Sequence, residues 1–148
     1  MRLAFFVNDV ATEVDEYTTT RLARAAAQAG HEVWYVGIGD VDLGESDGQL
    51  AARAHAAEFE NDDTLEAFME RIKERDTERI VMDDLDAMFL RNESIDDLQE
   101  RPWATPLGVV FGQMLKARGV TVANDPMALM RATSKLYLEE FPVMIRPR

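Results

Sequence analysis

Two short apolar segments separated by a helix-forming stretch most constrain how this chain folds. Residues 2–7 have the pattern of a strand buried on both faces, and residues 33–36 form a second such segment. Between them, an alanine-rich stretch over 21–29 predicts a helix that the threonines at 18–20 are expected to cap and that Gly30 ends. Strands joined in this way pair in parallel through a right-handed crossover. The sequence therefore predicts an N-terminal βαβ unit.

Further helices and strands alternate along the rest of the chain. The pattern predicts helices over 65–75 and 105–117, a short apolar segment at 80–82, and core strands over 86–91 and 120–123. The helix over 105–117 is expected to turn one stripe inward, made of Leu107, Val110, Phe111, Met114 and Leu115.

A hairpin is predicted after the second strand. The turn-forming pair Asp47-Gly48 separates residues 41–43 from residues 49–54. The alanines of 49–57 also fit a helix, and we favour the strand. The fold predicted for the whole chain is a three-layer, Rossmann-like α/β domain with a mostly parallel sheet and a small β-hairpin excursion.

Composition and charge exclude several classes of function. The 148 residues suit one domain, and the net charge of −12 opposes binding to nucleic acid, which requires clustered Lys and Arg. The absence of cysteine excludes disulfides and thiol nucleophiles. No apolar run reaches the roughly 18 residues of a transmembrane helix, and the N-terminus enters a strand at once instead of a signal peptide. We therefore expect a cytoplasmic protein that binds neither nucleic acid nor membrane.

Three of the predicted strands end in polar residues, at Asn8-Asp9, at Arg91-Asn92-Glu93 and at Asn124-Asp125. Open parallel sheets bind ligands at the carboxyl ends of their strands. An arginine at such an end presents a preorganised fork to a carboxylate. A structural salt bridge from Arg91 to Asp9 or Glu93 is the alternative, and the residues alone leave both interpretations open.

Other kinds of site find no support in the sequence. His31 and His55 lack the spacing of a metal site, and the scattered acidic pairs are typical of a solvated surface. Neither a Gly-x-Gly-x-x-Gly motif nor a P-loop follows the first strand. We therefore predict no catalytic residue and no metal ligand within this chain.

Five short motifs follow one another in a fixed order along nearly the whole chain. They are Asn8-Asp9-Val10, Thr18-Thr19-Thr20, Ala29-Gly30-His31-Glu32-Val33, Phe89-Leu90-Arg91-Asn92-Glu93-Ser94, and the segment from Asn124-Asp125-Pro126 to Lys135-Leu136. This series resembles the first domain of glutathione-synthetase-like ATP-grasp ligases, and its last motif is the most specific. The resemblance implies a pre-ATP-grasp, substrate-binding domain over 1–125, followed over 126–148 by junction helices and a connector toward an ATP-grasp domain that this chain lacks.

The resemblance also implies a chemistry and a set of site residues. A ligase of this kind uses ATP and Mg²⁺ to convert a carboxylate into an acyl phosphate, which an amine then attacks. The substrate, a small peptide or amino acid, would contact Arg91, Asn92, Asp9, Thr19 and Thr20, and Lys135 would contact an ATP phosphate. We expect the chain to bind no ATP or Mg²⁺ and to have no ligase activity until the remainder of the enzyme is present.

Departures from the family pattern concern the substrate. Val10 stands in place of a loop proline, and Asn92-Glu93-Ser94 replaces Lys-Asp-Pro. Loss of a cation and gain of an acid beside Arg91 favour an acceptor more basic than γ-glutamylcysteine, or a different carboxylate. Two rival interpretations remain, namely a stand-alone flavodoxin-like module that binds a small anion or a protein, and a structural domain that forms a homo-oligomer through its helices.

Overall fold

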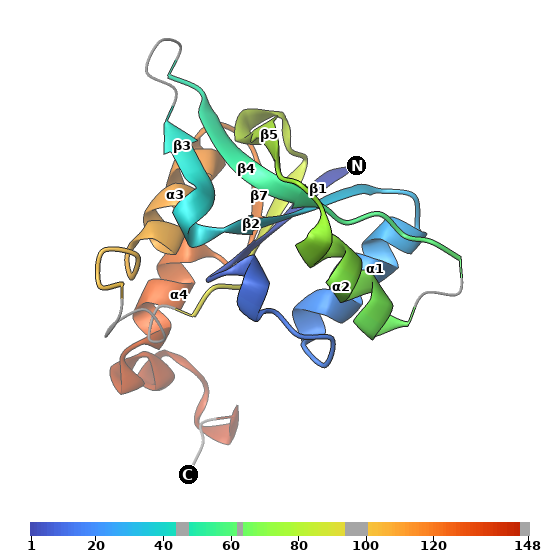
Figure 1. Cartoon of the computed structure of the whole chain (residues 1–148). Helices are drawn as coiled ribbons and strands as arrows, with labels where there is room; N and C mark the ends of the chain where they lie inside the picture. Colours follow the sequence, from blue (N-terminus) through green and yellow to red (C-terminus); the bar gives the residue numbers. More distant parts are fainter. Residues whose placement is uncertain (44–47, 62–63, 94–100, 146–148) are drawn as a thin grey trace.

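The computed structural model describes residues 1–43, 48–61, 64–93 and 101–145 (Figure 1). The turn residue Asp47 lies outside these ranges. The strands are β1 (Arg2–Val7), β2 (Glu32–Gly37), β3 (Val41–Leu43), β4 (Leu50–Ala56), β5 (Glu78–Val81), β6 (Ala87–Leu90) and β7 (Thr121–Ala123). The α-helices are α1 (Thr18–Gln28), α2 (Leu65–Glu74), α3 (Leu107–Ala117) and α4 (Pro126–Ala132). Short 3-10 helices are η1 (Val10–Thr12), η2 (Ile38–Asp40), η3 (Met82–Asp84), η4 (Lys135–Glu140) and η5 (Val143–Ile145).

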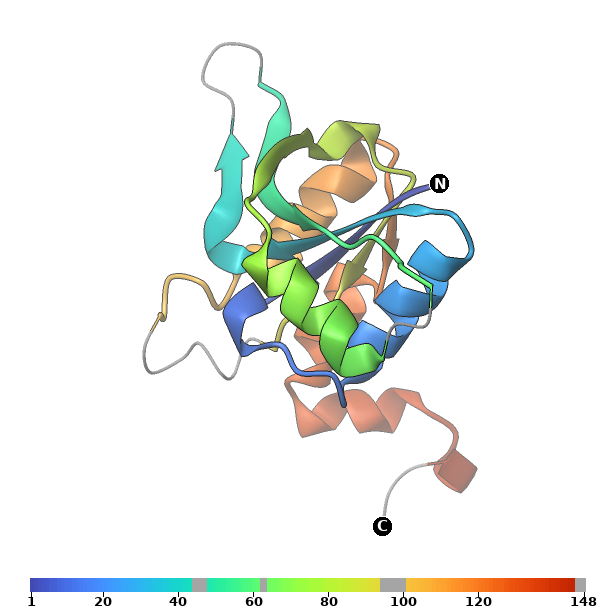
Figure 2. The same cartoon turned by 45° about the vertical axis from the view of Figure 1, so that its right-hand side comes forward.

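The strands form one sheet in the order β3-β4-β2-β1-β6-β7, with β5 also paired to β4. Strands β2, β1, β6 and β7 are parallel neighbours. The hairpin of β3 and β4 is present as predicted, and β4 pairs antiparallel with β2, β3 and β5. Figure 2 shows β3 and the start of β4 side by side at the upper left of the molecule. The sheet is therefore parallel at its centre and antiparallel at one side.

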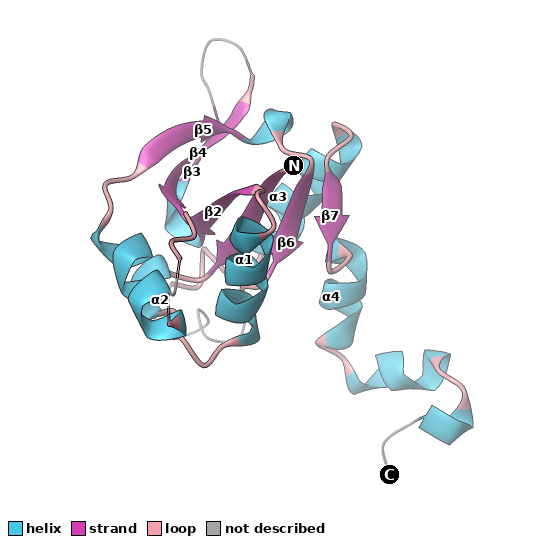
Figure 3. Ribbon diagram, turned by 90° about the vertical axis from the view of Figure 1, so that its right-hand side faces the viewer, coloured by secondary structure: helices cyan, strands magenta, loops and turns pink. Residues whose placement is uncertain are grey.

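Alternating side chains of β1 form two cores, because successive residues of a strand point to opposite faces of the sheet. Leu3, Phe5 and Val7 pack with residues of α1 and α2, whereas Ala4 and Phe6 pack with residues of α3. Phe5 stacks between Tyr35 and Phe89 of the neighbouring strands. Figure 3 shows α1 and α2 on one face of the sheet and α3 on the other. The predicted three-layer arrangement is confirmed.

The start of α1 differs from the prediction. Tyr17, and none of the threonines, occupies the N-cap position, and its side chain makes no capping hydrogen bond. Thr18–Thr20 form the first turn of the helix instead, which buries the side chains of Thr19 and Thr20. The first turn of α1 therefore lacks a side-chain cap at the carboxyl edge of the sheet.

The inward face of α3 agrees with the prediction for Leu107, Phe111, Met114 and Leu115, which are buried or pack against the core, and differs from it at Val110. Val110 is 45% exposed, whereas Gly108, Phe111, Gly112 and Leu115 are buried. A Cβ atom on Gly112 would lie 2.8 Å from Leu90 Cδ1 and 2.9 Å from Pro126 Cγ. Gly112 therefore allows α3 to approach β6 and the start of α4 closely.

The Asn-Asp-Pro turn after β7 is built from side-chain hydrogen bonds. Asn124 adopts a left-handed backbone (φ 60°), and its amide donates to the Leu90 carbonyl oxygen at 2.7 Å. Asp125 caps α4 by accepting hydrogen bonds from the peptide nitrogens of Met127 and Ala128, each at 3.0 Å. Bonding to Lys116 Nζ lowers the pKa of Asp125, and the Ala128 peptide N–H contributes. These contacts hold the start of α4 against β6 and α3.

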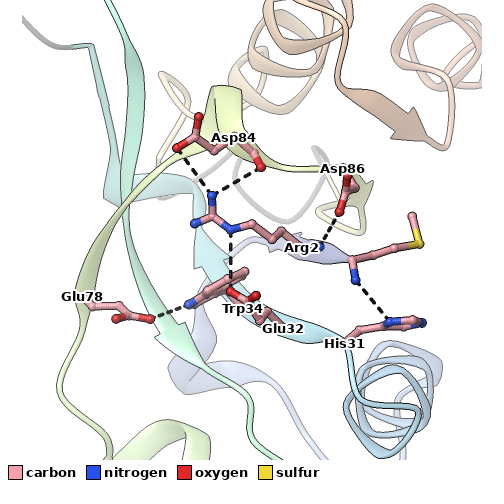
Figure 4. Close-up of polar contacts among 8 residues, drawn as sticks. Arg2, His31, Glu32, Trp34, Glu78, Asp84 and Asp86 are labelled. Carbon is pink, nitrogen blue, oxygen red and sulfur yellow. Dashed lines mark hydrogen bonds and ion pairs between the residues drawn. The ribbon is translucent and has the colours of Figure 1, made fainter.

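A polar network lies at the opposite, amino-terminal edge of the sheet (Figure 4). The Arg2 guanidinium lies 5.3 Å from the centroid of the Trp34 ring and forms ion pairs with Glu32 (3.7 Å) and Asp84 (3.5 Å). Trp34 Nε1 donates to Glu78. The network links β1, β2, β5 and η3, and it is a structural feature far from the polar strand ends.

The segment after α4 extends away from the sheet (Figure 3). It carries exposed apolar side chains, including Leu136 (78% exposed) and Met144 (96% exposed). In the described part of the chain, no helix has both the length and the apolar character needed to cross a membrane.

Candidate functional site

A pocket of about 350 Å³ opens where β1 and β6 end, beside the first turn of α1. Because β1 and β6 are adjacent and parallel, the residues that follow them reach the same edge of the sheet. The lining combines residues from after β1, from the start of α1 and from after β6, namely Asn8, Thr12, Glu13, Tyr17, Thr18, Thr19, Arg91 and Glu93. The lining is predominantly polar and includes side chains of both charges.

Arg91 is the arginine that lines the pocket. Its peptide nitrogen extends the pairing of β6 with β1 by donating to the Phe6 carbonyl oxygen at 2.8 Å, and its side chain is half-buried. The guanidinium Nε donates to Thr19 Oγ1 at 3.1 Å. Within the described ranges, Arg91 forms no ion pair, and its two terminal nitrogens donate to no protein group. The alternative of a salt bridge to Asp9 or Glu93 is therefore not realised in the described structure.

The two loops that flank the pocket are tied to each other. Asn8 Nδ2 donates to the Glu93 carbonyl oxygen at 2.9 Å, and the Glu93 peptide nitrogen donates to Asn8 Oδ1 at 2.7 Å. Arg101 Nη2 donates to the Asn8 carbonyl oxygen at 3.2 Å. These bonds fix the segment after Arg91 against the end of β1, so the position of the guanidinium is set by the backbone on both sides.

Glu13 contributes a buried negative charge to the pocket wall. The residue is 8% exposed, and its Oε2 atom is buried without a hydrogen-bond partner among the described residues. Burial raises the pKa of Glu13, and the positive charges of Arg91 and Lys73 oppose this shift. Tyr35 is also buried; its pKa is raised above the usual range by burial, and the charge of Glu13 adds to the effect. The pocket therefore holds a carboxylate that the described protein groups do not neutralise by direct pairing.

The structure brings only part of the predicted site together. Arg91 and Thr19 meet in the pocket, whereas Thr20 lies behind it, fully buried, and donates to the Val14 carbonyl oxygen at 2.7 Å. Asp9 does not line the pocket and instead caps η1 by accepting a hydrogen bond from the Ala11 peptide nitrogen at 2.9 Å. Asn92 packs its side-chain amide over Gly108 of α3, outside the pocket lining.

Lys135 does not line the pocket. It begins η4 in the exposed C-terminal segment, which leads away from the sheet beyond α4 (Figure 2). In the described part of the chain, no group of three or more His, Asp or Glu side chains is arranged to hold a metal ion.

Sequence reasoning missed several of the lining residues. The sequence indicates Asn8 only as part of a polar strand end. The connection between β1 and α1, whose sequence has no helix or strand periodicity, contributes three more lining residues, namely Thr12, Glu13 and Tyr17. The one available signal for this loop was its position, because it connects the carboxyl end of β1 to the start of α1. Any polar residue in such a connection is a candidate for the site.

Chemically, the described lining offers groups that can bind a charged ligand. The two terminal nitrogens of Arg91, which donate to no group in the described part of the chain, match the geometry of a carboxylate. The uncapped first turn of α1 adds peptide N–H groups and the positive end of the helix dipole on the same side. Glu13 supplies the opposite charge.

Comparison with known proteins identifies the family. The sequence model of the prokaryotic glutathione synthetase N-terminal domain matches residues 1–131, which is most of the chain. A comparison with curated proteins gave no significant match. The match includes β1 to β7, the pocket residues and nearly all of α4. The chain therefore belongs to the family of prokaryotic glutathione synthetase N-terminal domains.

Proposed function

We propose that this chain is the substrate-binding N-terminal domain of an ATP-dependent carboxylate–amine ligase similar to glutathione synthetase, and that it has no ligase activity by itself. Family membership supports the ligase class. The observation that carries substrate binding is the Arg91 guanidinium, which is held by Thr19 at 3.1 Å with its terminal nitrogens unused by the described protein. The proposed ligand is a small peptide or amino acid with a carboxylate.

Arg91 would hold that carboxylate by two parallel hydrogen bonds. Thr19 fixes the guanidinium through Nε, so the remaining edge of the planar group points to the ligand without further loss of side-chain freedom. Charge-assisted pairs of this geometry are about twice as strong as neutral hydrogen bonds. The residues tested should therefore be Arg91 first and Thr19 second, with Asp9, Thr20 and Asn92 acting through the loops that they stabilise.

The remaining parts of the proposed reaction lie with the rest of the ligase. ATP, bound with Mg²⁺, supplies the phosphoryl group that activates the substrate carboxylate. We propose that exposed Lys135 contacts an ATP phosphate once the ATP-binding domain is joined to the segment 126–148. The proposed setting is the cytoplasm, where an ATP-dependent biosynthetic ligase finds its substrates.

A titration of the isotope-labelled chain with butyrate tests the binding role of Arg91. We expect saturable chemical-shift changes at the peptide groups of Thr18, Thr19 and Arg91. Arg91→Met should abolish them, because it retains the apolar stem and removes the fork. Arg21→Met, which removes an exposed charge outside the pocket, is the matched control and should leave them unchanged.

Two results would contradict the proposal. Equal butyrate binding by Arg91→Met would show that the guanidinium is not the carboxylate receptor. Binding of inorganic phosphate without binding of any carboxylate would favour a small-anion module. Separately, release of phosphate from ATP by residues 1–148 alone would overturn the proposed inactivity of the isolated domain.

A further inference from the structure

We infer that Glu13 makes this pocket a receptor for a zwitterionic head group, with the ligand's ammonium held by Glu13 and its carboxylate held by Arg91. The inference rests on the proposed carboxylate binding by Arg91 and adds a second, oppositely charged determinant. In this inference Glu13 determines the specificity of the pocket. It selects ligands that carry an amino group beside the carboxylate, such as free amino acids and the amino-acid ends of peptides.

The first argument is the uncompensated burial of Glu13. Only 8% of the residue is exposed, and Oε2 has no hydrogen-bond partner among the described residues. A buried carboxylate is costly unless a cation or several donors satisfy it. The charges of Arg91 and Lys73 act on Glu13 through space, and neither residue forms an ion pair with it in the described structure. The carboxylate thus lacks the direct partner that burial of a charge requires.

The second argument is that Glu13 and Arg91 line the same cavity. The cavity holds about 350 Å³, which is ample for an amino-acid head group. Thr19 already occupies Nε of Arg91, so the guanidinium fork and the Glu13 carboxylate are the two buried or half-buried charged groups that the lining offers to a ligand. A ligand with only a carboxylate would satisfy Arg91 and leave Glu13 unpaired. A ligand with adjacent ammonium and carboxylate groups satisfies both.

The third argument is the charge at the mouth of the cavity. Glu93 is exposed, lines the same pocket and adds a second negative charge there. With two acids and one arginine, the charged side chains of the lining sum to a net negative charge, which attracts the cationic group of a ligand. The approach of a simple carboxylate is correspondingly opposed.

The experiment compares three ligands of nearly equal size on the chain 1–148 by chemical-shift titration. L-2-aminobutyrate carries both charged groups, butyrate lacks the amine, and propylamine lacks the carboxylate. We expect L-2-aminobutyrate to bind at least about tenfold more tightly than butyrate, as a charge-assisted hydrogen bond to a buried carboxylate predicts. Glu13→Gln should remove this preference and strengthen butyrate binding, because the variant preserves the shape of the side chain and removes the negative charge that opposes a carboxylate.

Glu16→Gln is the matched control, since it makes the same change at an exposed position of the same loop outside the lining. It should retain the preference for L-2-aminobutyrate. Equal affinity of the wild-type chain for butyrate and L-2-aminobutyrate would refute the role of Glu13 and leave the carboxylate site intact. An unchanged preference in Glu13→Gln would refute it as well. Failure of both carboxylates to bind the wild-type chain would overturn the proposed function together with this inference.

Discussion

The side-chain amide of Asn8 exchanges two hydrogen bonds with the backbone of Glu93, at 2.9 Å and 2.7 Å. This pair connects the end of β1 to the residues that follow β6, two segments that are 85 residues apart in the chain. Since Arg91 lies between β6 and Glu93, the pair determines the path of the backbone that carries the guanidinium into the pocket.

Replacement of Asn8 by alanine should therefore weaken both stability and ligand binding. Loss of the reciprocal bonds is expected to lower the free energy of unfolding by about 1–2 kcal/mol. Butyrate binding should weaken because the loop after Arg91 is released. Urea denaturation and the titration described above measure the two effects. Asn61→Ala, at an exposed position in a turn, is the control and should change stability by less than about 0.5 kcal/mol.

The close packing at Gly112 yields a second prediction. Gly112→Ala would place a methyl group 2.9 Å from the ring of Pro126, which cannot move without displacing the start of α4. We expect a loss of about 1–2 kcal/mol in unfolding free energy despite the better helix propensity of alanine. Thermal unfolding provides the measurement. Gly39→Ala is the control, because a Cβ at Gly39 would meet nothing within 4 Å.

The Arg2 network at the amino-terminal edge should contribute in a salt-dependent way. Arg2→Met keeps an apolar stem beside Trp34 but removes the cation–π contact and both ion pairs. We expect a loss of about 0.5–1 kcal/mol at low ionic strength that shrinks at 1 M salt, since the charged partners are largely exposed. Denaturation followed by tryptophan fluorescence tests this, with Arg21→Met as the control. A loss that is unaffected by salt would assign the effect to packing instead.

Glu13 should give the unfolding free energy a pH dependence of definite sign. Burial raises its pKa in the folded state above the ordinary value of 4.5, so the folded chain binds more protons than the unfolded chain as pH rises past 4.5. The contribution of Glu13 to stability therefore falls with rising pH in this range. Glu13→Gln lacks this contribution, and its stability relative to wild type should increase from pH 4.5 upward. Paired urea denaturations at several pH values measure the difference, which also cancels the opposite contributions of Glu58 and Asp125.

Local patterns predicted the arrangement of the fold well where one physical signal dominated. The apolar runs of β1 and β2 with the Gly30 stop defined the βαβ unit, and the helix predicted over 65–75 is α2. The predicted inward face of α3 is correct for four of its five residues and wrong for Val110, and it omits the buried Gly108 and Gly112. Glycine has no hydrophobic side chain, so a pattern of hydrophobic residues does not reveal a helix face on which glycines allow close packing against neighbouring elements.

The candidate site shows a similar division. Arg91 could be selected from the sequence because it ends an apolar strand, and its bond to Thr19 follows from the adjacency of β6, β1 and α1. Glu13 could not be selected, since its significance lies in burial without a partner, which only the packed structure reveals. Asp9 is polar and correctly located in sequence, but its side chain is already engaged with the backbone of η1.

The outermost strands of the sheet are short. Strands β3 and β7 span three residues each, and β5 spans four. An approaching chain would therefore find few unpaired backbone groups along these margins, so growth of the sheet by addition of a foreign strand is disfavoured. The isolated domain should therefore resist aggregation through its strand edges at the concentrations that titrations require.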